Sequence, residues 1–554
     1  MSNSLRKMMP HIAAIAIYLF CGIAVQSQTT LVASDPGPRP PGLRAKFQVA
    51  DTHGNTIPDF VQPVDATVNS AGNFLPNLTA DQIAFWFAGL AIFGDTASVQ
   101  GVPRFVSSTE PLGGLGPGFN GTSCFMCHSE PAIGGSGPGP GSPLFTQNPQ
   151  LLVAHHRGAT NSENLSSILT PSGPVREVRF VLNPDGSPDG GVHPLFTIAG
   201  RDDAPVGCTL AQPDFNAQLA NNNAIFRIPI STFGEGFVEN TPEKILHANL
   251  VANGALKTSL GIQGRFNTNG NDGTFTRFGW KAQNKSMLLF SGEASNVEMG
   301  VTNEIFQNER LGSIFCVGNQ LPEDLTNIFP RATLAGLASD GAAASAISSN
   351  IENFAVFMRL NAAPAQCDFA SGLDANNNAL CNPLSASALR GKALFGIPTA
   401  ATPNAVSCVL CHSDHLMTGP SSFTDLSNAT FAPFSDFALH HMGSTLTDGV
   451  NQGLAGPDEF RTAPLWGLGQ RIFLLHDGRT ADLLAAIQAH ASPGTDCTVV
   501  TSQAGTTFIL NTQTVQIPAI ASQFCGSEAN QVISNFNLLN PTEQLDLVHF
   551  LRSL

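Results

Sequence analysis

The stretch GLGPGFNGTSCFMCHSEPAIGGSG, which runs from Gly114 to Gly137, sets two cysteines and one histidine among many glycines. The pattern C-x-x-C-H occurs twice in the chain, at Cys124, Cys127 and His128 and again at Cys408, Cys411 and His412. With only 11 cysteines and 14 histidines in 554 residues, two such patterns would rarely occur by chance. The repeated motif therefore indicates a chemical role for these six residues.

The N-terminus has the composition of a secretory signal peptide. Arg6 and Lys7 precede an apolar run over residues 12–25, and small and polar residues follow it. Cys21 is preceded by phenylalanine, whereas a lipid-anchored cysteine needs a small residue in that place. No later segment has the roughly 18 consecutive apolar residues of a membrane span. We therefore expect a signal peptide over residues 1–28, no membrane anchor, and a periplasmic or secreted protein.

The charge balance limits the kinds of partner. The net charge is −15, and only 12% of the residues are charged. A nucleic-acid partner would need a clustered basic face, so we expect none. Small molecules or a basic redox protein fit this composition better.

In an exported chain, C-x-x-C-H is the attachment signal for c-type haem. The two thiols add to the porphyrin and the adjacent histidine ligates the iron. Two alternatives remain open: a structural zinc site built from two C-x-x-C pairs, and thiol redox motifs. Both are disfavoured because the pairs lie far apart and each is followed by histidine. The sequence therefore predicts two covalently bound haem c groups, with His128 and His412 as iron ligands.

Six further cysteines suit disulfides in an oxidising compartment. Fifteen pairings of six cysteines are formally open. The pairing most local in sequence joins Cys367 to Cys381 and Cys497 to Cys525, and leaves Cys208 to pair with Cys316.

Helical patterns flank both motifs. The segment LTADQIAFWFAGLAIFG, from Leu78, predicts a helix that leads to the first motif, and a later pattern predicts one that ends at Asn361. The segment SASALRGKALFG predicts a helix before the second motif, with its inward face formed by Leu389, Ala393, Leu394 and Phe395.

The C-terminal segment NPTEQLDLVHFLRSL has the signals of a capped helix. Asn540 can cap it, Pro541 fits the first helical position, and Glu543 can close a capping box. The apolar face of this helix is formed by Leu547, Val548, Leu551 and Leu554.

Strand patterns are few. VREVRFVL, from Val175, and VHPLFTIAG, from Val192, are joined by a turn-rich segment and predict a hairpin. We therefore expect a mainly α fold with two cytochrome c-like haem domains, long loops and a small β-hairpin insertion. The expected organisation is an extended N-terminal segment over residues 29–75, a first haem domain with insertions over 76–361, a linker over 362–384 and a second cytochrome c domain over 385–554.

His490 is the candidate for a second ligand at the second haem. The pattern from Thr480 to His490 is helical, and it sets Leu483, Ile487 and His490 on one apolar face. A buried histidine bonded to a backbone carbonyl is the plainer interpretation. A domain that already needs a second iron ligand favours ligation instead.

Several segments resemble the di-haem c-type oxidoreductase family, often called thiol oxidoreductase-like, which is related to the bacterial di-haem cytochrome c peroxidases and to the di-haem rubber oxygenases. The resembling segments are GLGPGFNGTSCFMCHSEP, FRIPISTFGEGFVENTP from Phe226, RFGWKAQNKSMLLFSGEASNVEMGVTNEIF from Arg277, LHHMGSTLTDG from Leu439 and FRTAPLWGLGQRIFLLHDGRTADLL from Phe460. They span most of the chain that follows the signal peptide.

The resemblance implies a peroxidase-like division of labour, in which the first haem is the reaction site and the second relays electrons. The related peroxidases ligate the second haem with a methionine where this chain has His490, and bis-histidine ligation would lower its potential. Glu298, in the segment EMG, matches their distal glutamate, and Trp280 matches a tryptophan between the haems. The distal glutamine of those enzymes has no clear equivalent here, because the positions about ten before Glu298 are apolar.

Other residues are weaker candidates. Glu239, among glycines, is a second candidate for proton transfer, although a capping or salt-bridge role is at least as plausible. Arg461 and Arg479 are expected to pair with the propionates of the second haem, and Arg277 or Lys281 with propionates nearby. The related peroxidases also carry calcium, so a Ca²⁺ ion between the domains is a further expectation.

Three functions remain open. The first is a peroxidase that uses a small-molecule oxidant, with a small redox protein as electron donor. The second is an oxygenase that uses dioxygen on a hydrophobic substrate, which the apolar run Met287–Phe290 would suit. The third is a plain electron-transfer cytochrome, in which His155 or His156 would close the first iron.

Overall fold

The computed structural model describes residues 32–38, 72–97, 115–311, 349–364 and 383–554, with gaps inside the third and fifth ranges, and residues 315, 316 and 366. Residues Ala33–Leu554 form one compact unit. The predicted signal peptide, the predicted Cys367–Cys381 disulfide and the side chains of His155 and His156 lie outside the described residues. In the ranges given above, no helix combines the length and the apolar character needed to cross a membrane.

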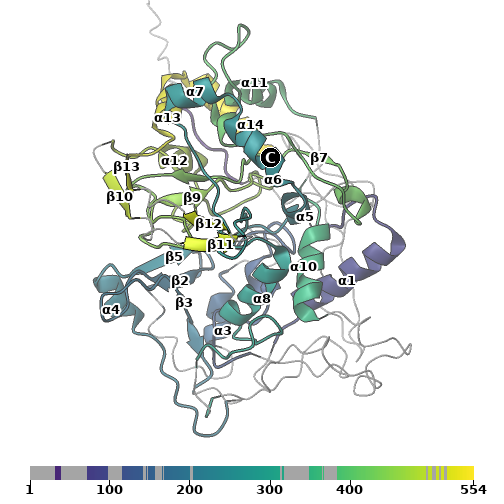
Figure 1. Cartoon of the computed structure of the whole chain (residues 1–554), viewed down its shortest axis with the longest axis vertical. Coiled ribbons are helices and arrows are strands. Elements are labelled where there is room, and N and C mark those ends of the chain that lie inside the picture. Colours follow the sequence, from purple (N-terminus) through teal and green to yellow (C-terminus); the bar gives the residue numbers. More distant parts are fainter. Residues whose placement is uncertain are drawn as a thin grey trace, which may run out of the picture. The chain divides into compact units, whose positions relative to one another are not determined.

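Two helices frame the first motif, which forms the short helix α2 (Cys124–Cys127). Helix α1 (Ala80–Gly94) begins at Thr79, where a capping box closes its N-terminus, and it leads toward the motif as the sequence predicts. Helix α10 (Asn350–Leu360) packs against α1 (Figure 1) and ends before Asn361, also as predicted.

A second helix pair frames the second motif. Helix α11 (Ala386–Phe395) precedes the motif, and α14 (Pro541–Arg552) closes the chain and packs against it (Figure 1). The capping box of α14, between Asn540 and Glu543, is formed as the sequence predicts. Its apolar face is buried, which is also confirmed.

Both helix pairs cross at a glycine. A Cβ added to Gly89 of α1 would lie 2.5 Å from the backbone oxygen of Asn353 in α10. A Cβ added to Gly391 of α11 would lie 1.9 Å from the backbone oxygen of Asp546 in α14. Only glycine allows the two backbones to approach so closely.

The helix before each motif also carries a phenylalanine four residues after its crossing glycine. Phe93 of α1 packs edge-on against His128, with ring centroids 6.1 Å apart. Phe395 of α11 lies 6.3 Å from His412. The two halves of the chain therefore contain the same arrangement of helix pair, phenylalanine and motif histidine.

The predicted inward face of α11 was partly wrong. Leu394 and Phe395 are buried, but Leu389 is 53% exposed and Ala393 is exposed, whereas Ala388 and Gly391 face the core. The close crossing with α14 at Gly391 selects the buried face, because the helix side without a bulky side chain is the side that α14 can approach.

The predicted hairpin is present within a three-stranded sheet of order β3-β2-β5. Strand β2 (Glu177–Phe180) pairs antiparallel with β3 (Val192–His193), and the register sets Val178 opposite His193. The third strand, β5 (Ala224–Arg227), was not expected, and it sets Arg227 opposite Glu177.

Helix α8 (Met287–Glu298) lies against α10 (Figure 1), so its C-terminal end is fixed next to the first motif. Of the run Met287–Phe290, Met287 is buried in the core and only Phe290 lines the cavity at the first motif.

The remaining elements are short. The other helices are α3 (Gln150–His155), α4 (Phe215–Ala220), α5 (Glu235–Glu239), α6 (Glu243–Val251), α7 (Gly254–Leu260), α12 (Leu483–Gln488) and α13 (Asn530–Leu538), with 3₁₀ turns over Cys408–Leu410 and Thr424–Leu426. Two-stranded antiparallel ladders join β1 (Gly118–Phe119) to β4 (Phe196–Thr197), β6 (Leu416–Met417) to β7 (Thr430–Phe431), β8 (Leu439–His441) to β9 (Glu459–Arg461), β10 (Cys497–Thr501) to β13 (Ala521–Cys525), and β11 (Thr507–Leu510) to β12 (Gln513–Gln516). The fold is therefore mainly α, as predicted.

Two large apolar cores hold these elements. One packs α1, α8 and α10 around the first motif, and the other packs α11, α13 and α14 around the second. The first core also contains Leu416, Leu426 and Trp466, which the sequence assigned to the second domain. The predicted domain boundaries stay a prediction.

The expected disulfide between Cys208 and Cys316 is formed. For the pair Cys497 and Cys525, the β10–β13 register sets the two backbone positions opposite each other, and their side chains lie outside the described atoms.

Candidate functional site

Each motif folds into one helical turn that ends at its histidine. In the first, the Ser123 hydroxyl accepts a hydrogen bond from the backbone N–H of Met126 at 3.2 Å, and the N–H of His128 donates to the carbonyl oxygen of Cys124 at 3.0 Å. In the second, the N–H of His412 donates to the carbonyl oxygen of Cys408 at 2.9 Å. The turn therefore presents both cysteines and the histidine from one short segment.

The two motifs lie in separate cavities. Cys124, Cys127 and His128 line the first cavity together with residues of β2, β5 and α8. Cys408, Cys411 and His412 line the second cavity together with residues of β9, α12, α13 and α14. Because the four cysteines are divided between two cavities, they do not form one shared four-sulfur zinc site.

The thiols are also poorly suited to redox exchange. Burial raises the pKa of Cys124 and of Cys408 to about 12, and it raises the pKa of Cys127 as well. A buried neutral thiol is a weak nucleophile. The thiol redox alternative to haem therefore loses support.

The histidines of the motifs are prepared for a metal. His128 Nδ1 lies 3.1 Å from the carbonyl oxygen of Gly135, and His412 Nδ1 lies 2.9 Å from that of Phe434. Burial lowers the pKa of both rings to about 4, so they are neutral. A neutral ring that donates from Nδ1 leaves the Nε2 lone pair for a metal ion.

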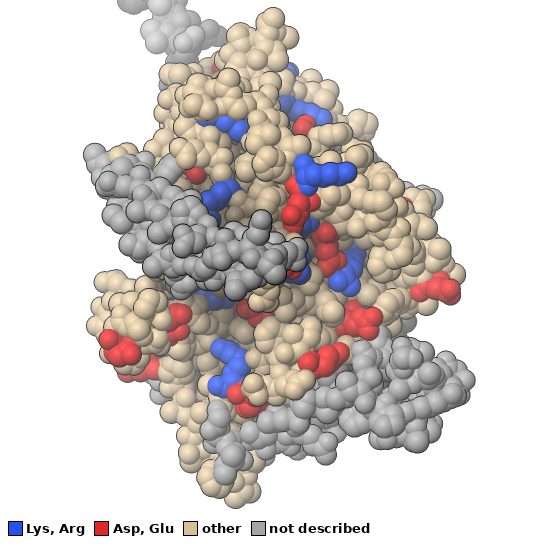
Figure 2. Space-filling view, viewed as in Figure 1, with Lys and Arg blue, Asp and Glu red and all other residues tan. Residues whose placement is uncertain are grey.

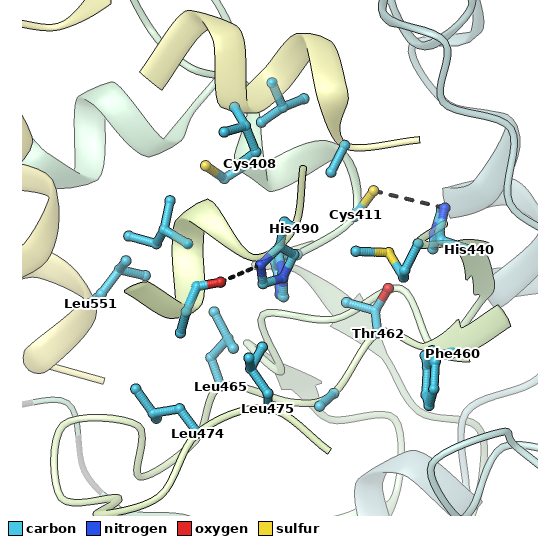
Figure 3. Close-up of a pocket in the computed structure, with 18 of the residues that line it drawn as sticks. Cys408, Cys411, His440, Phe460, Thr462, Leu465, Leu474, Leu475, His490 and Leu551 are labelled. Carbon is cyan, nitrogen blue, oxygen red and sulfur yellow. Dashed lines mark hydrogen bonds between the residues drawn. The ribbon is translucent and has the colours of Figure 1, made fainter. Parts of the chain in front are cut away.

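His490 faces the second cavity from the turn that follows α12. The helix is shorter than the predicted segment Thr480–His490, because the Asp482 side chain caps it at Leu484 and Ala485. His490 Nδ1 lies 2.7 Å from the carbonyl oxygen of Ala486, and burial lowers the pKa of the ring. Figure 3 shows its ring turned into the same space as Cys408 and Cys411. The ring therefore offers Nε2 to this cavity in the same way as His412.

Three arginines, one buried and two half-buried, line the cavities and could pair with an anion. Arg461 is only 2% exposed, lines the second cavity, and its Nε and Nη2 have no hydrogen-bond partner among the described residues. Arg471 lines the same cavity, and burial lowers its pKa to about 10. In the first cavity, Arg176 Nε has no partner within the described ranges. An apolar pocket with unpaired buried cations fits the propionates of haem.

Arg479 lies elsewhere. It is exposed, it pairs with Asp477 at 2.7 Å, and it is not among the residues that line the second cavity. Arg471, which the sequence did not single out, lines the second cavity instead.

Arg277 and Lys281 are also engaged by the protein. Arg277 Nη1 donates to the carbonyl oxygen of Thr241 at 2.6 Å. The fully buried Lys281 Nζ lies 3.1 Å from Asp448 Oδ1 and donates to the carbonyl oxygens of Gly456 and Glu459 at 2.8 and 3.0 Å. Neither residue lines a cavity at a motif.

Glu298 lines the first cavity, as the resemblance implies. It is the last residue of α8, and its Oε2 accepts a hydrogen bond from Asn120 Nδ2 at 2.8 Å. Burial and the charge of Glu177 raise the pKa of Glu298 to about 8. A carboxyl that is protonated near neutral pH can donate as well as accept a proton.

Glu239 occupies a structural position. Its Oε1 accepts a hydrogen bond from the backbone N–H of Met287 at 2.8 Å, and its carboxylate forms an ion pair with Arg359. It therefore joins α5 to the start of α8 and the end of α10, and it is not among the residues that line the first cavity.

Trp280 lines both cavities. Its Nε1–H donates to the carbonyl oxygen of Ile228 at 2.9 Å, and its ring lies edge-on to His476, with centroids 6.3 Å apart. It is therefore placed to connect the two sites.

The first cavity contains polar residues that the sequence did not reveal. Gln283, three residues after Trp280, lines it, and its Oε1 is buried without a partner among the described residues. Glu177 and Arg179 of β2 also line it. A strand alternation that sets Glu177 and Arg179 on one face was visible in the sequence, but which face meets the cavity was not.

One cluster near the second cavity could suggest a metal. Among the described residues, Cys411, Asp436 and His440 form the group close enough to share an ion. Yet His440 Nε2 lies 3.1 Å from Asp436 Oδ2, and Nδ1 lies 2.7 Å from Glu528 Oε2. Both ring nitrogens are thus used by carboxylates, so His440 acts as a buried cation. The expected calcium ion stays a prediction.

The described surface carries few charges. On the face shown in Figure 2, Lys and Arg side chains are interspersed with Asp and Glu, and among the described residues they do not gather into a basic patch.

Comparison with known families gives one match. A family described as "Di-haem oxidoreductase, putative peroxidase" matches residues 179–504, which is more than half of the chain and includes the second motif. No curated protein matches the chain.

Proposed function

This chain belongs to the di-haem oxidoreductase family, and we propose on that premise that it is an exported peroxidase-type enzyme with one haem c covalently bound at each C-x-x-C-H motif. The first site is the reaction site and the second relays electrons to it. The observation that carries this proposal is that Glu298, a carboxyl protonated near neutral pH, lies in the same cavity as His128.

Haem bound at the first site would supply an iron that binds peroxide and exchanges electrons with it. Glu298 then moves a proton between the two peroxide oxygens, and Asn120 holds its carboxyl in place. Gln283, with an unpartnered oxygen among the described atoms, adds a polar group to the same cavity. These polar groups support peroxide as the substrate.

The relay role of the second site rests on its two histidines. His412 and His490 both line the cavity and both direct Nδ1 to a backbone carbonyl. These two imidazoles would hold the iron of a haem bound there, which would supply electron transfer rather than substrate binding. Trp280, which lines both cavities, is the natural connection to the reaction site.

An oxygenase acting on a hydrophobic substrate is the second candidate. Phe290 and Ala294 of α8 give the first cavity an apolar part that such a substrate would contact. Glu298, Glu177, Arg179 and Gln283 line the same cavity, and this polar set favours the peroxidase.

Electron paramagnetic resonance of the purified ferric protein tests the proposal. We expect one high-spin signal from the first site beside one low-spin signal from the bis-histidine second site. Peroxide should then change the first signal, whereas dioxygen added to the reduced protein distinguishes an oxygenase. Two low-spin signals that persist after half-reduction would contradict the proposal and indicate an electron-transfer cytochrome.

A further inference from the structure

Two carboxyl groups meet in the first cavity. Glu177 comes from β2 and Glu298 from the last turn of α8; both line this cavity, and each carboxyl is close enough to form a hydrogen bond with the other. Two carboxylates can form such a bond only when one of them carries a proton. The two residues lie 121 positions apart in the sequence (298 − 177), so only the fold brings them together.

The surroundings of the two carboxyls differ. Glu177 Oε1 accepts a hydrogen bond from Arg179 Nε at 2.6 Å, and Arg227 adds positive charge from β5. These cations outweigh burial and hold the pKa of Glu177 below its ordinary value. Glu298 accepts a hydrogen bond from the neutral Asn120 rather than from a cation, among the described residues, and it lies at the negative end of the α8 dipole.

The other charged groups near the pair do not change this asymmetry. Arg310 lies near both carboxyls, and Glu293, one turn before Glu298 on α8, adds a further negative charge near Arg179. The buried Cys124 and Cys127 thiols face Glu298 and are neutral.

We propose that Glu177 and Glu298 work as one pair that holds a single proton, with Glu298 as the protonated member and Glu177 as the charged one. The proposal makes Glu177 a further catalytic residue, because both carboxyls line the cavity where the substrate would bind. The inference deepens the proposed function and rests on it.

The pair balances protons in the cleavage of peroxide. The charged carboxylate accepts the proton of one peroxide oxygen, and the protonated carboxyl gives its proton to the other oxygen, which leaves as water. The pair ends with the same one proton that it held at the start. The remaining oxygen is reduced to water by two electrons from the donor and two protons from solvent. Above the pH at which the pair loses its proton, the donor for the leaving oxygen is lost and turnover falls.

Infrared pH-difference spectra of the haem-loaded ferric protein test the pair without turnover. Between pH about 6 and about 10, the wild type should lose the C=O band of one carboxylic acid with a midpoint near pH 8. Glu177→Gln removes the neighbouring charge and frees Arg179 for Glu298, so the midpoint should fall by roughly one pH unit or more. Glu298→Gln should remove the band. If Glu177→Gln does not fold, the absence of the band in Glu298→Gln is the test of the proposal.

Two further variants serve as matched controls. Glu177→Asp keeps the charge and should keep a band that titrates on the alkaline side. Glu293→Gln makes the same chemical change one turn away on α8, in the same cavity, and should leave the band in place. A band whose midpoint is the same in Glu177→Gln as in the wild type would overturn the proposal, as would a band that survives in Glu298→Gln.

Turnover separates the pair from the proposed function. If the band behaves as expected but peroxide is not consumed, the pair stands and the peroxidase assignment fails. If peroxide is consumed and its alkaline limit is unchanged in Glu177→Gln, the peroxidase assignment stands and the pair fails. We expect that limit to move to lower pH.

Discussion

The two ring nitrogens have separate roles, and these roles are the same in His128, His412 and His490. In each ring Nδ1 faces a backbone carbonyl at 2.7–3.1 Å, and burial lowers the pKa. Fixing the tautomer in this way directs Nε2 toward the cavity before any metal arrives. From the sequence alone, His490 could be either a core residue or an iron ligand. Its hydrogen bond to the carbonyl oxygen of Ala486 fits both roles, because it satisfies Nδ1 and leaves Nε2 available for a metal ion.

Replacement of His490 by methionine tests this residue. Methionine is a weaker donor to ferric iron, so the reduction potential of the second haem should rise, by roughly 0.1 V within the span of about 0.8 V that axial ligands give. Potentiometric titration measures the change. His247→Met is the control, because His247 is exposed on α6 and lines neither cavity. An unchanged potential in His490→Met would remove His490 from the ligand set.

The contribution of His440 to the stability of the fold should depend on pH. Burial alone would lower its pKa, but Cys411 and the carboxylates of Asp436 and Glu528 raise it well above the ordinary value. The two carboxylates keep this effect when the Cys411 sulfur is neutral. A raised pKa stabilises the fold fully below about pH 6.5, and the stabilisation is lost as the pH rises through the raised value.

His440→Gln should therefore cost about 3 kcal/mol at pH 6, because it leaves two buried carboxylates unpaired. The difference from the wild type should shrink as the pH rises above about 6.5. Urea unfolding of the haem-loaded proteins at several pH values measures it. A difference that stays constant across the range would show that His440 is neutral in the fold.

At the scale of elements, each motif depends on a helix crossing without side chains between the backbones. Gly89 and Gly391 are the crossing residues, and each is followed four residues later by the phenylalanine that packs on the motif histidine. The crossing therefore sets the position of the ring that supports the histidine. The chain uses the same arrangement twice.

Gly391→Ala tests this arrangement. In an ordinary helix interior the change to alanine stabilises by up to about 1 kcal/mol. Here the new Cβ would meet the backbone oxygen of Asp546 at 1.9 Å, so α11 and α14 must separate and the protein should lose about 2 kcal/mol. Thermal unfolding of the haem-loaded protein reports the loss.

Gly254→Ala is the matched control, because Gly254 also lies in a helix, α7, and a Cβ there would have no neighbour within 4 Å. Equal stability of the two variants would mean that α11 and α14 can separate to admit the new Cβ without loss of unfolding free energy.

At the scale of the whole molecule, the two cavities are joined by residues from separate parts of the sequence. Trp280 lines both, and Ile228, which accepts the hydrogen bond of Trp280, also donates its own N–H to the carbonyl oxygen of His476 at 2.8 Å. We therefore propose Trp280 as the electron route between the two sites.

Trp280→Phe should leave the visible spectra of both haems unchanged. After peroxide is added to the half-reduced protein, the second haem of this variant should be oxidised about tenfold or more slowly than in the wild type. A tenfold change corresponds to about 1.4 kcal/mol in the activation free energy. Stopped-flow absorbance measures this rate. Trp466→Phe is the matched control, because Trp466 is a buried tryptophan that lines neither cavity. Equal rates in the two variants would place the route elsewhere.

Features that depend on neighbouring residues were predictable. The C-x-x-C-H turns, the capping box of α14, the end of α10 and the β2–β3 hairpin follow from a few consecutive residues. The disulfide between Cys208 and Cys316 was reached by pairing the other cysteines locally first. Local bonding decides the turns, the cap, the helix end and the hairpin, so the sequence by itself determined them, whereas the Cys208–Cys316 bond joins residues 108 positions apart and depends on the fold.

Features that depend on distant segments were decided only by the tertiary structure. Leu389 was expected inside and is exposed, since the position of α14 selects the buried face of α11. Glu239 pairs with Arg359, and Arg479 remains at the surface while Arg471 enters the cavity. Glu177 and Glu298 share a proton because β2 and the end of α8 meet at one cavity. The sequence by itself determined the two C-x-x-C-H motifs, and the packing of remote elements decided which other groups meet them, because burial and charge act through space.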